Sequence, residues 1–354
     1  MYLSDFDFEL PGELIAQEPL AERGQSRLLT LDRSTGTLGD GRFSELPNLF
    51  DAGDLLVVND TKVFAARLLG RRLPGGGAAE CLLLRRVESV PRDARVEVWE
   101  ALVHPGQRLK EGSRLEFGDG DLTIRAEVLA RRFHGRRTLR LETERRSLTA
   151  AVDAIGHVPL PPYIKRPDSS ADRERYQTVF ATTRGSVAAP TAGLHFTPAL
   201  LAALDARGVE RTAITLHVGY GTFQPIREPM IENHRMEAEH FEVSAAAAAA
   251  INRARHQQRR VVAVGTTTTR TLESLPIDEK GDVQAAAGST DLFIRPGHRF
   301  GVVSALITNF HLPQSSLLLL VCAFAGRDQA LRAYRHAVEE RYRFYSYGDA
   351  MLCR

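Results

Sequence analysis

Long apolar runs, paired cysteines and lysine are scarce in this chain of 354 residues. No stretch approaches the ~20 consecutive apolar residues of a membrane-spanning helix, so no membrane span is expected. The acidic N-terminus lacks the basic-then-apolar pattern of an export signal. The cysteines at 81, 322 and 353 have no paired spacing, which argues against disulfides or a zinc site and favours the reducing cytoplasm. Only four of the 46 basic residues are lysine, and genome base composition explains this more simply than selection for phosphate pairing.

Charge is nearly balanced over the whole chain, with a formal net charge of +2, but it is unevenly distributed. Residues 66–150 hold 18 basic and 12 acidic side chains, a net charge of 18 − 12 = +6. The remainder holds 28 basic and 32 acidic side chains, a net charge of 28 − 32 = −4. A basic module on a mildly acidic body suits an enzyme that binds RNA phosphates. The alternative is a solvated β surface with a surplus of arginine.

The pattern of short strands and helices divides the chain into two kinds of segment. Residues 66–149 alternate β-like runs with turn clusters and contain no convincing helix, which is typical of a small barrel or sandwich. Residues 1–65 and 150–354 read as strands that alternate with helices, a pattern that predicts a mostly parallel sheet. The expected fold class is therefore α/β, a mostly parallel sheet flanked by helices, with an inserted small all-β barrel-like domain.

Several elements of the α/β part have clear boundaries. Thr197 followed by Pro198 predicts an N-cap and first turn, and Gly208 a C-terminal cap. Ser244 predicts the cap of an alanine-rich helix. The expected helices are 198–207, 245–257, 268–275, 315–325 and 328–343, and the expected strands include 54–60, 211–218, 260–265 and 302–308.

Small and polar residues gather in the segment 185–197, which runs into the helix at Pro198. Glycines let a ligand approach the backbone, hydroxyls supply polar contacts, and a helix N-terminus favours an anionic or polar group. The ligand candidates here are Ser186, Thr191 and Gly193, together with the imidazole of His195.

Polar residues also follow four of the expected strands. In open α/β sheets, ligands bind beyond the carboxyl ends of the strands. Taken singly, each group has a structural alternative: threonines cap helices, histidines form hydrogen bonds, and Asn-Asp marks a turn. The groups are Asn59, Asp60, Thr61 and Lys62; His217, Gly219 and Gly221; Gly265, Thr266, Thr267 and Arg270; and Asn309 and His311.

A metal site is not expected. His234 and His240 flank Met236–Glu239, but the spacing matches no His-Glu-x-x-His or Cys/His ligand set. The threonine-rich turn after Gly265 is neither a P-loop nor a dinucleotide fingerprint, because the required lysine and glycine positions are absent.

A set of motifs in family order resembles the S-adenosylmethionine:tRNA ribosyltransferase-isomerase family of queuosine biosynthesis. The resemblance covers nearly the full length, with one departure: members usually carry histidine, serine and glutamate after the methionine, where this chain has Glu237, Ala238 and Glu239. The motifs lie at 59–63, 176–197, 216–223, 264–273, 290–297, 305–313 and 345–351.

The resemblance implies a cytoplasmic, tRNA-modifying transferase. The ribosyl part of S-adenosylmethionine would pass to 7-aminomethyl-7-deazaguanine in the anticodon loop of tRNA, giving epoxyqueuosine-tRNA, adenine and methionine. S-adenosylmethionine would be consumed as a substrate, and no metal or redox cofactor is implied. The oligomeric state stays open, with a monomer favoured over an oligomer.

That reaction needs a base to remove a ribose 5′ proton and an acid or hydrogen bond to help adenine leave. Histidine suits both roles near neutral pH. The catalytic candidates are therefore His217 and His311, with His195 third and the carboxylates of Asp60 and Glu239 as rivals. Arg270 and the threonines beside it are expected to hold a carboxylate or ribose hydroxyls. The candidate phosphate contacts of the β module are Arg131, Arg132, Arg136 and Arg137.

Two other functions stay open on the residues alone. A non-catalytic RNA-binding protein would explain the charge distribution but not the polar strand ends. A nucleoside or phosphosugar transferase that acts without RNA would explain the strand ends but leave the basic module without a role.

Overall fold

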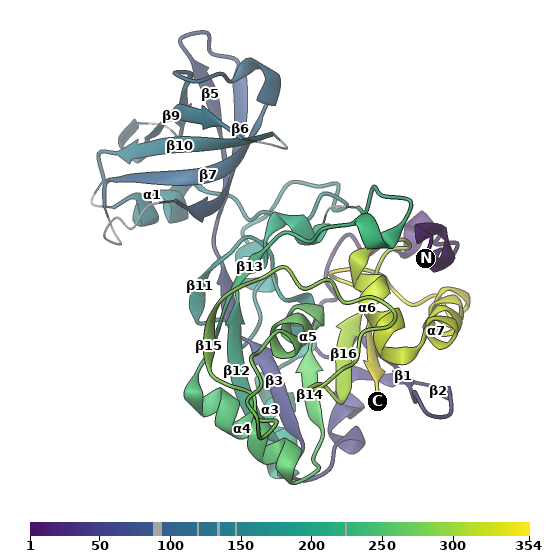
Figure 1. Ribbon diagram of the computed structural model, residues 1–354. Coiled ribbons are helices and arrows are strands. Elements are labelled where there is room, and N and C mark those ends of the chain that lie inside the picture. Colours follow the sequence, from purple (N-terminus) through teal and green to yellow (C-terminus); the bar gives the residue numbers. More distant parts are fainter. Residues whose placement is uncertain (88–93, 119, 133–134, 146, 224) are drawn as a thin grey trace.

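The computed structural model describes the chain from Met1 to Arg354 except residues 88–93, 119, 133–134, 146 and 224. It contains a large sheet covered by helices and a closed β-barrel that stands out from this body (Figure 1). A short parallel pair, β4 (Thr61–Val63) with β11 (Thr183–Ser186), lies where the chain passes from the body to the barrel.

The large sheet has nine strands, and its centre is parallel. Strands β12, β3, β14 and β16 run parallel to one another, and so do β17 and β1. The pairings of β15 with β13, β13 with β12, β16 with β17 and β1 with β2 are antiparallel, so the predicted parallel character holds for the centre and not for the outer strands. In sheet order the strands are β15 (Ala286–Thr290), β13 (Glu239–Val243), β12 (Glu210–Leu216), β3 (Leu55–Asn59), β14 (Val261–Val264), β16 (Ala305–Asn309), β17 (Ala350–Cys353), β1 (Arg27–Leu31) and β2 (Leu38–Arg42).

Every residue of β3, β14 and β16 is buried, as expected for central strands covered on both faces. One face packs against α4 (Ala245–His256), α5 (Thr266–Glu273), α6 (Ser316–Ala325) and α7 (Arg327–Glu339). The other packs against α3 (Pro198–Ala206) and the 3₁₀ segment η3 (Phe43–Leu49). Alternate side chains of the central strands therefore enter two separate apolar cores.

The predicted helix caps are present. The Oγ1 of Thr197 accepts from the backbone N of Leu200 at 3.1 Å, and the Oγ of Ser244 accepts from Ala247 at 3.2 Å. The helix predicted at 268–275 begins two residues earlier, at Thr266, directly after Gly265. This shift places two more threonines in its first turn.

The barrel strands all lie within the segment that the sequence marks as β-rich. Leucine, phenylalanine and alanine side chains fill its interior, and helix α1 (Leu148–Ile155) packs against the same core. A second short helix, α2 (Asp172–Arg175), follows in the body. The barrel closes in the order β10 (Arg136–Thr143), β7 (Val96–His104), β6 (Ala78–Arg86), β5 (Arg67–Leu73), β8 (Arg114–Phe117) and β9 (Ile124–Arg131).

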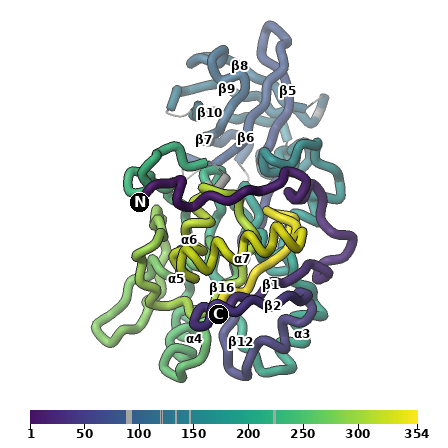
Figure 2. Tube along the Cα trace, turned by 90° about the vertical axis from the view of Figure 1, so that its right-hand side faces the viewer, coloured from purple at the N-terminus to yellow at the C-terminus, as the bar shows by residue number. Residues whose placement is uncertain are grey.

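The N-terminal segment crosses the body beneath the barrel and lies beside the C-terminal helices (Figure 2). The backbone N of Ala16 donates to the O of Phe344 at 3.2 Å, and the N of Phe344 donates to Leu14 at 2.8 Å. Residues 14–16 and Phe344 thus lie side by side, although the two termini themselves are apart (Figures 1 and 2).

Candidate functional site

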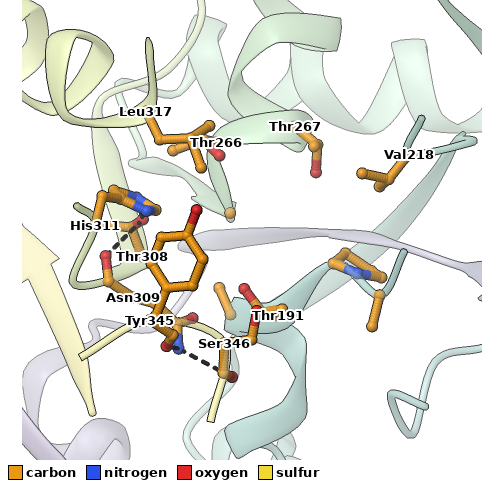
Figure 3. A pocket seen from close by; sticks show the side chains of 14 residues that line it. Thr191, Val218, Thr266, Thr267, Thr308, Asn309, His311, Leu317, Tyr345 and Ser346 are labelled. Carbon is orange, nitrogen blue, oxygen red and sulfur yellow. Dashed lines mark hydrogen bonds between the residues drawn. The ribbon is translucent and has the colours of Figure 1, made fainter. Parts of the chain in front are cut away.

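A cavity that is partly open to solvent lies beyond the carboxyl ends of β14 and β16, and its space, open solvent included, is about 510 Å³ (Figure 3). Six residues that the sequence singled out line it: Thr191, Gly265, Thr266, Thr267, Asn309 and His311. Sequence reasoning assigned no role to the other lining residues, which are Ala189, Pro190, Ala192, Val218, Thr308, Leu317, Tyr345 and Ser346.

The turn from β14 into α5 forms one wall of the cavity. Gly265 has φ +94°, a conformation that favours glycine, and a side chain there would approach Ala192. The hydroxyls of Thr268 and Thr269 donate back to Val264 O at 2.7 Å and Gly265 O at 3.1 Å. Thr266 and Thr267 instead line the cavity, where the first backbone N–H groups of the helix also lack intrahelical acceptors. This wall suits hydroxyls or an anionic group.

His311 stands on the opposite side, after β16. The side chain is buried, its Nε2 lies 2.7 Å from Thr308 Oγ1, and its backbone N donates to Tyr334 Oη at 3.2 Å. Burial lowers the pKa of His311 to about 3, so the imidazole is neutral at neutral pH. The neutral imidazole can therefore form hydrogen bonds, and it can accept a proton because it does not already carry an extra one.

Tyr345 has the least expected conformation in the cavity. Its φ is +75°, in the left-handed region that side chains other than glycine rarely adopt. The amide of Asn309 holds this backbone by donating to Tyr345 O at 2.9 Å. Burial raises the pKa of Tyr345 to about 12, so the phenol stays protonated and can donate a hydrogen bond. Strained backbone concentrates at functional sites, and no pattern in the sequence indicates it here.

His195 lies behind the cavity rather than in its lining. It is buried, and its Nδ1 is 2.8 Å from the Oγ of Ser26. Burial lowers its pKa to about 4. Gly193, two residues earlier, packs so closely on Thr178 that a Cβ would lie 2.9 Å from that side chain. These two residues shape the wall that presents Thr191.

His217 and the polar residues after β3 also lie outside the lining. The Nδ1 of His217 is 2.8 Å from Thr61 Oγ1, and its ring stacks on that of His240. Asn59 joins β3 to β12 through hydrogen bonds with the backbone N and O of Leu216. These contacts hold the ends of β3 and β12 in place, and Val218, which follows β12, lines the cavity.

Three further candidates make structural contacts or face solvent. Asp60 accepts from the hydroxyls of Thr182 at 2.9 Å and Thr215 at 2.6 Å. Ser186 is buried and accepts from the backbone N of Val218 at 2.8 Å. Lys62 is exposed on β4. Roles for these residues in substrate binding or catalysis remain predictions.

Glu239 and Arg270 form a buried ion pair with each other. The Nε of Arg270 donates to Leu292 O at 3.0 Å, and Glu239 Oε1 accepts from the backbone N of Gly219 at 2.8 Å. Arg270 therefore points to Glu239, away from the lining residues.

A Cβ on Gly221 would lie 2.7 Å from the carboxylate of Glu237. The predicted ligand roles of Arg270 and the two glycines remain untested.

The four arginines predicted to bind phosphate divide into two pairs. Arg131 and Arg132 are exposed and line a depression on the barrel together with Arg108. Arg136 pairs with Glu100 at 3.2 Å and also with Glu237 of the body. Arg137 is buried, and its Nε donates to Leu109 O at 3.0 Å. The first pair faces solvent, whereas the second pair is engaged by acceptors of the protein itself. Arg136 is partly exposed, and Arg137 is buried but lines the same depression.

The described residues offer neither a metal-ligand cluster nor a membrane-spanning helix. Among them, no group of three or more His, Cys, Asp or Glu side chains is placed to hold a metal ion. None of the helices in the described part of the chain is long and apolar enough to cross a membrane.

Comparisons with known proteins agree over the full length. The model of a family described as queuosine biosynthesis protein matches residues 3–353. The S-adenosylmethionine:tRNA ribosyltransferase-isomerase of Anaeromyxobacter sp. (strain Fw109-5) is 54% identical over 352 residues, and that of Solibacter usitatus (strain Ellin6076) is 50% identical over 368 residues, each covering 99% of both chains. The crystal structure of S-adenosylmethionine tRNA ribosyltransferase from Thermotoga maritima is 37% identical, covers 99% of this chain and 100% of its own, and superposes with a TM-score of 0.54.

Proposed function

The chain belongs to the queuosine biosynthesis protein family, and on that premise we propose that the cavity beyond β14 and β16 is its active site. The enzyme is an S-adenosylmethionine:tRNA ribosyltransferase-isomerase. It moves the ribosyl part of S-adenosylmethionine to 7-aminomethyl-7-deazaguanine in tRNA and yields epoxyqueuosine-tRNA, adenine and methionine. The observation that carries the site assignment is the convergence of six polar or glycine positions on one cavity, five from the ends of β14 and β16 and Thr191 from a 3₁₀ segment.

The two walls of the cavity suit different parts of a nucleoside. Thr266 and Thr267, at the start of α5, offer donors to ribose hydroxyls or to a carboxylate. The ring of Tyr345 offers a flat apolar surface to a nucleobase, and its protonated hydroxyl offers a donor. We therefore assign the adenosine part of S-adenosylmethionine to the space between these walls.

His311 is the acid–base group that this geometry favours. Of the three histidines nominated from the sequence, it lines the cavity, whereas His195 and His217 do not. A neutral imidazole can take the proton that the neighbouring sulfonium acidifies, and can later return a proton toward the leaving adenine. Its low pKa makes it a weak base for this proton removal.

The RNA substrate would be held by the barrel as well as by the cavity. A modified base in an anticodon loop is unpaired and can be presented to a pocket. Arg131, Arg132 and Arg108 are exposed around one depression and are our candidates for phosphate contacts. We place the reaction in the cytoplasm and invoke no metal or redox cofactor.

The test is incubation with S-adenosylmethionine and precursor-modified tRNA, with adenine as the measured product. Adenine release that requires both substrates is expected. Release without tRNA would favour a nucleoside transferase, and tRNA binding without any release would favour a non-catalytic RNA-binding protein.

A further inference from the structure

A second, smaller pocket adjoins the cavity, and its charged lining is two arginines and one glutamate. Its space, open solvent included, is about 320 Å³, and Ser346 lines both this pocket and the cavity (Figure 3 shows Ser346 from the cavity side). Its polar lining consists of Glu22, Arg23, Ser26, Arg175, His195, Ser346 and Tyr347, and we call it the arginine pocket.

The two arginines come from distant segments and hold each other's backbone. Arg23 donates from Nη1 to Gln177 O at 2.5 Å and from Nη2 to Glu174 O at 2.7 Å. Arg175 donates from Nη1 to Ala21 O at 2.7 Å and from Nη2 to Leu20 O at 2.6 Å. These bonds occupy part of the N–H groups of each guanidinium, and carbonyl oxygens do not neutralise the two positive charges.

The positive charge has no ion-pair partner among the described residues. Within that part of the chain, neither Arg23 nor Arg175 forms an ion pair, and the carboxylate of Glu22 accepts from Gln25 at 2.7 Å. The Nε of Arg175 is buried and has no acceptor there. Half-buried like charges are costly unless an anion is bound between them.

Nearby groups respond to the same positive field. Burial and the charge of Arg175 lower the pKa of Arg23, and the carboxylate of Glu174 offsets only part of this effect. After burial, the charges of Arg23 and Arg343 contribute to the lowered pKa of His195. A further positive side chain, Arg343, therefore also acts on this region.

We propose that the arginine pocket binds an oxyanion of a substrate whose reacting part occupies the adjoining cavity. This inference rests on the proposed function. Guanidinium groups bind phosphates and carboxylates through paired, charge-assisted hydrogen bonds, and Ser26 and Ser346 add hydroxyl donors. Two parts of the substrates carry this chemistry: a backbone phosphate of the tRNA and the carboxylate of the methionyl group.

The first experiment measures anion binding without turnover. Inorganic phosphate should raise the melting temperature of the wild-type enzyme, and Arg23→Gln and Arg175→Gln should each lose most of that shift. Arg33→Gln is the matched control, because Arg33 also donates to two backbone carbonyls, at 3.2 and 3.1 Å, but does not line this pocket. If Arg23→Gln fails to fold, Arg23→Lys takes its place. It keeps the positive charge and should retain part of the shift in melting temperature.

The second experiment identifies the source of the anion from the KM of each substrate. A rise of about tenfold for tRNA alone assigns the pocket to an RNA phosphate, and the same rise for S-adenosylmethionine alone assigns it to the methionyl carboxylate. An unchanged phosphate shift in both pocket variants, an equal loss in Arg33→Gln, or unchanged KM values for both substrates would overturn the proposal. Adenine release by the wild-type enzyme tests the proposed function separately, because the phosphate shift requires no reaction.

Discussion

The α/β body and the barrel differ in how their polar residues are used. In the body, polar residues after strands β14 and β16 meet at one cavity, because parallel strands deliver their carboxyl ends to the same edge. In the barrel, two arginines close in the sequence have opposite environments: Arg132 is exposed and Arg137 is buried. Topology thus gathers residues in the body, whereas in the barrel the local contacts of each arginine decide its role.

The largest effect should come from the body. His311→Ala should lower the rate of adenine release by about 10²- to 10⁴-fold, the range expected for loss of a general acid–base group. His256→Ala is the control, since that exposed histidine pairs with Asp282 on the surface. Steady-state kinetics with both substrates would check this. A comparable loss of rate in the two variants would contradict a special role for the cavity histidine.

Acid should destabilise the body before the barrel. Burial lowers the pKa values of His311 and His195 to about 3 and about 4, below the ordinary value of 6.5. Between those values and 6.5 the unfolded chain binds protons that the folded chain does not, so the free energy of unfolding falls as the pH falls from about 6.5. We expect each histidine to contribute a loss of about 3 kcal/mol by pH 4, since each pKa unit is worth about 1.4 kcal/mol.

Two signals can separate the parts during this titration. Far-ultraviolet circular dichroism reports mainly on the helices of the body, and Trp99, the only tryptophan, reports on barrel strand β7. Helix loss at a higher pH than the change in tryptophan fluorescence is expected. The reverse order would place the acid-sensitive groups in the barrel.

Charge reversal should divide the barrel arginines by their environment. The double variant Arg131→Glu/Arg132→Glu should weaken tRNA binding by about tenfold or more and reduce its dependence on salt, because fewer phosphates are neutralised and fewer counterions are released on binding. Arg137→Gln should lower the melting temperature and leave the salt dependence unchanged, since its guanidinium serves backbone carbonyls. Equal salt dependence in all proteins would show that the exposed pair does not bind phosphate.

The smallest effect should come from the ion pair that links the two parts. Arg136 joins Glu237 across the junction between barrel and body, and both side chains are partly exposed. Such a pair is worth about 0–1 kcal/mol, so Glu237→Gln should lower the free energy of unfolding by no more than that. Denaturant unfolding of both proteins would measure it, and a loss well above about 1 kcal/mol would contradict this expectation.

The sequence predicted the backbone of both parts, including the β-rich segment that forms the barrel, better than it predicted the side-chain contacts. Caps at Thr197 and Ser244 were readable because capping is local. The cavity residues were readable as strand ends. The engagement of Arg270 with Glu239 was not, because it joins α5 to β13 across 31 positions of the chain. The positive φ of Tyr345 could not be predicted from the sequence either, because tertiary contacts impose it.

The most direct test of the proposed active site is a crystal structure of the enzyme with an unreactive S-adenosylmethionine analogue. We expect the adenosine to lie between Thr266 and Tyr345, with its ribose 5′ carbon within reach of His311. An analogue bound elsewhere, away from the cavity beyond β14 and β16, would contradict the assignment.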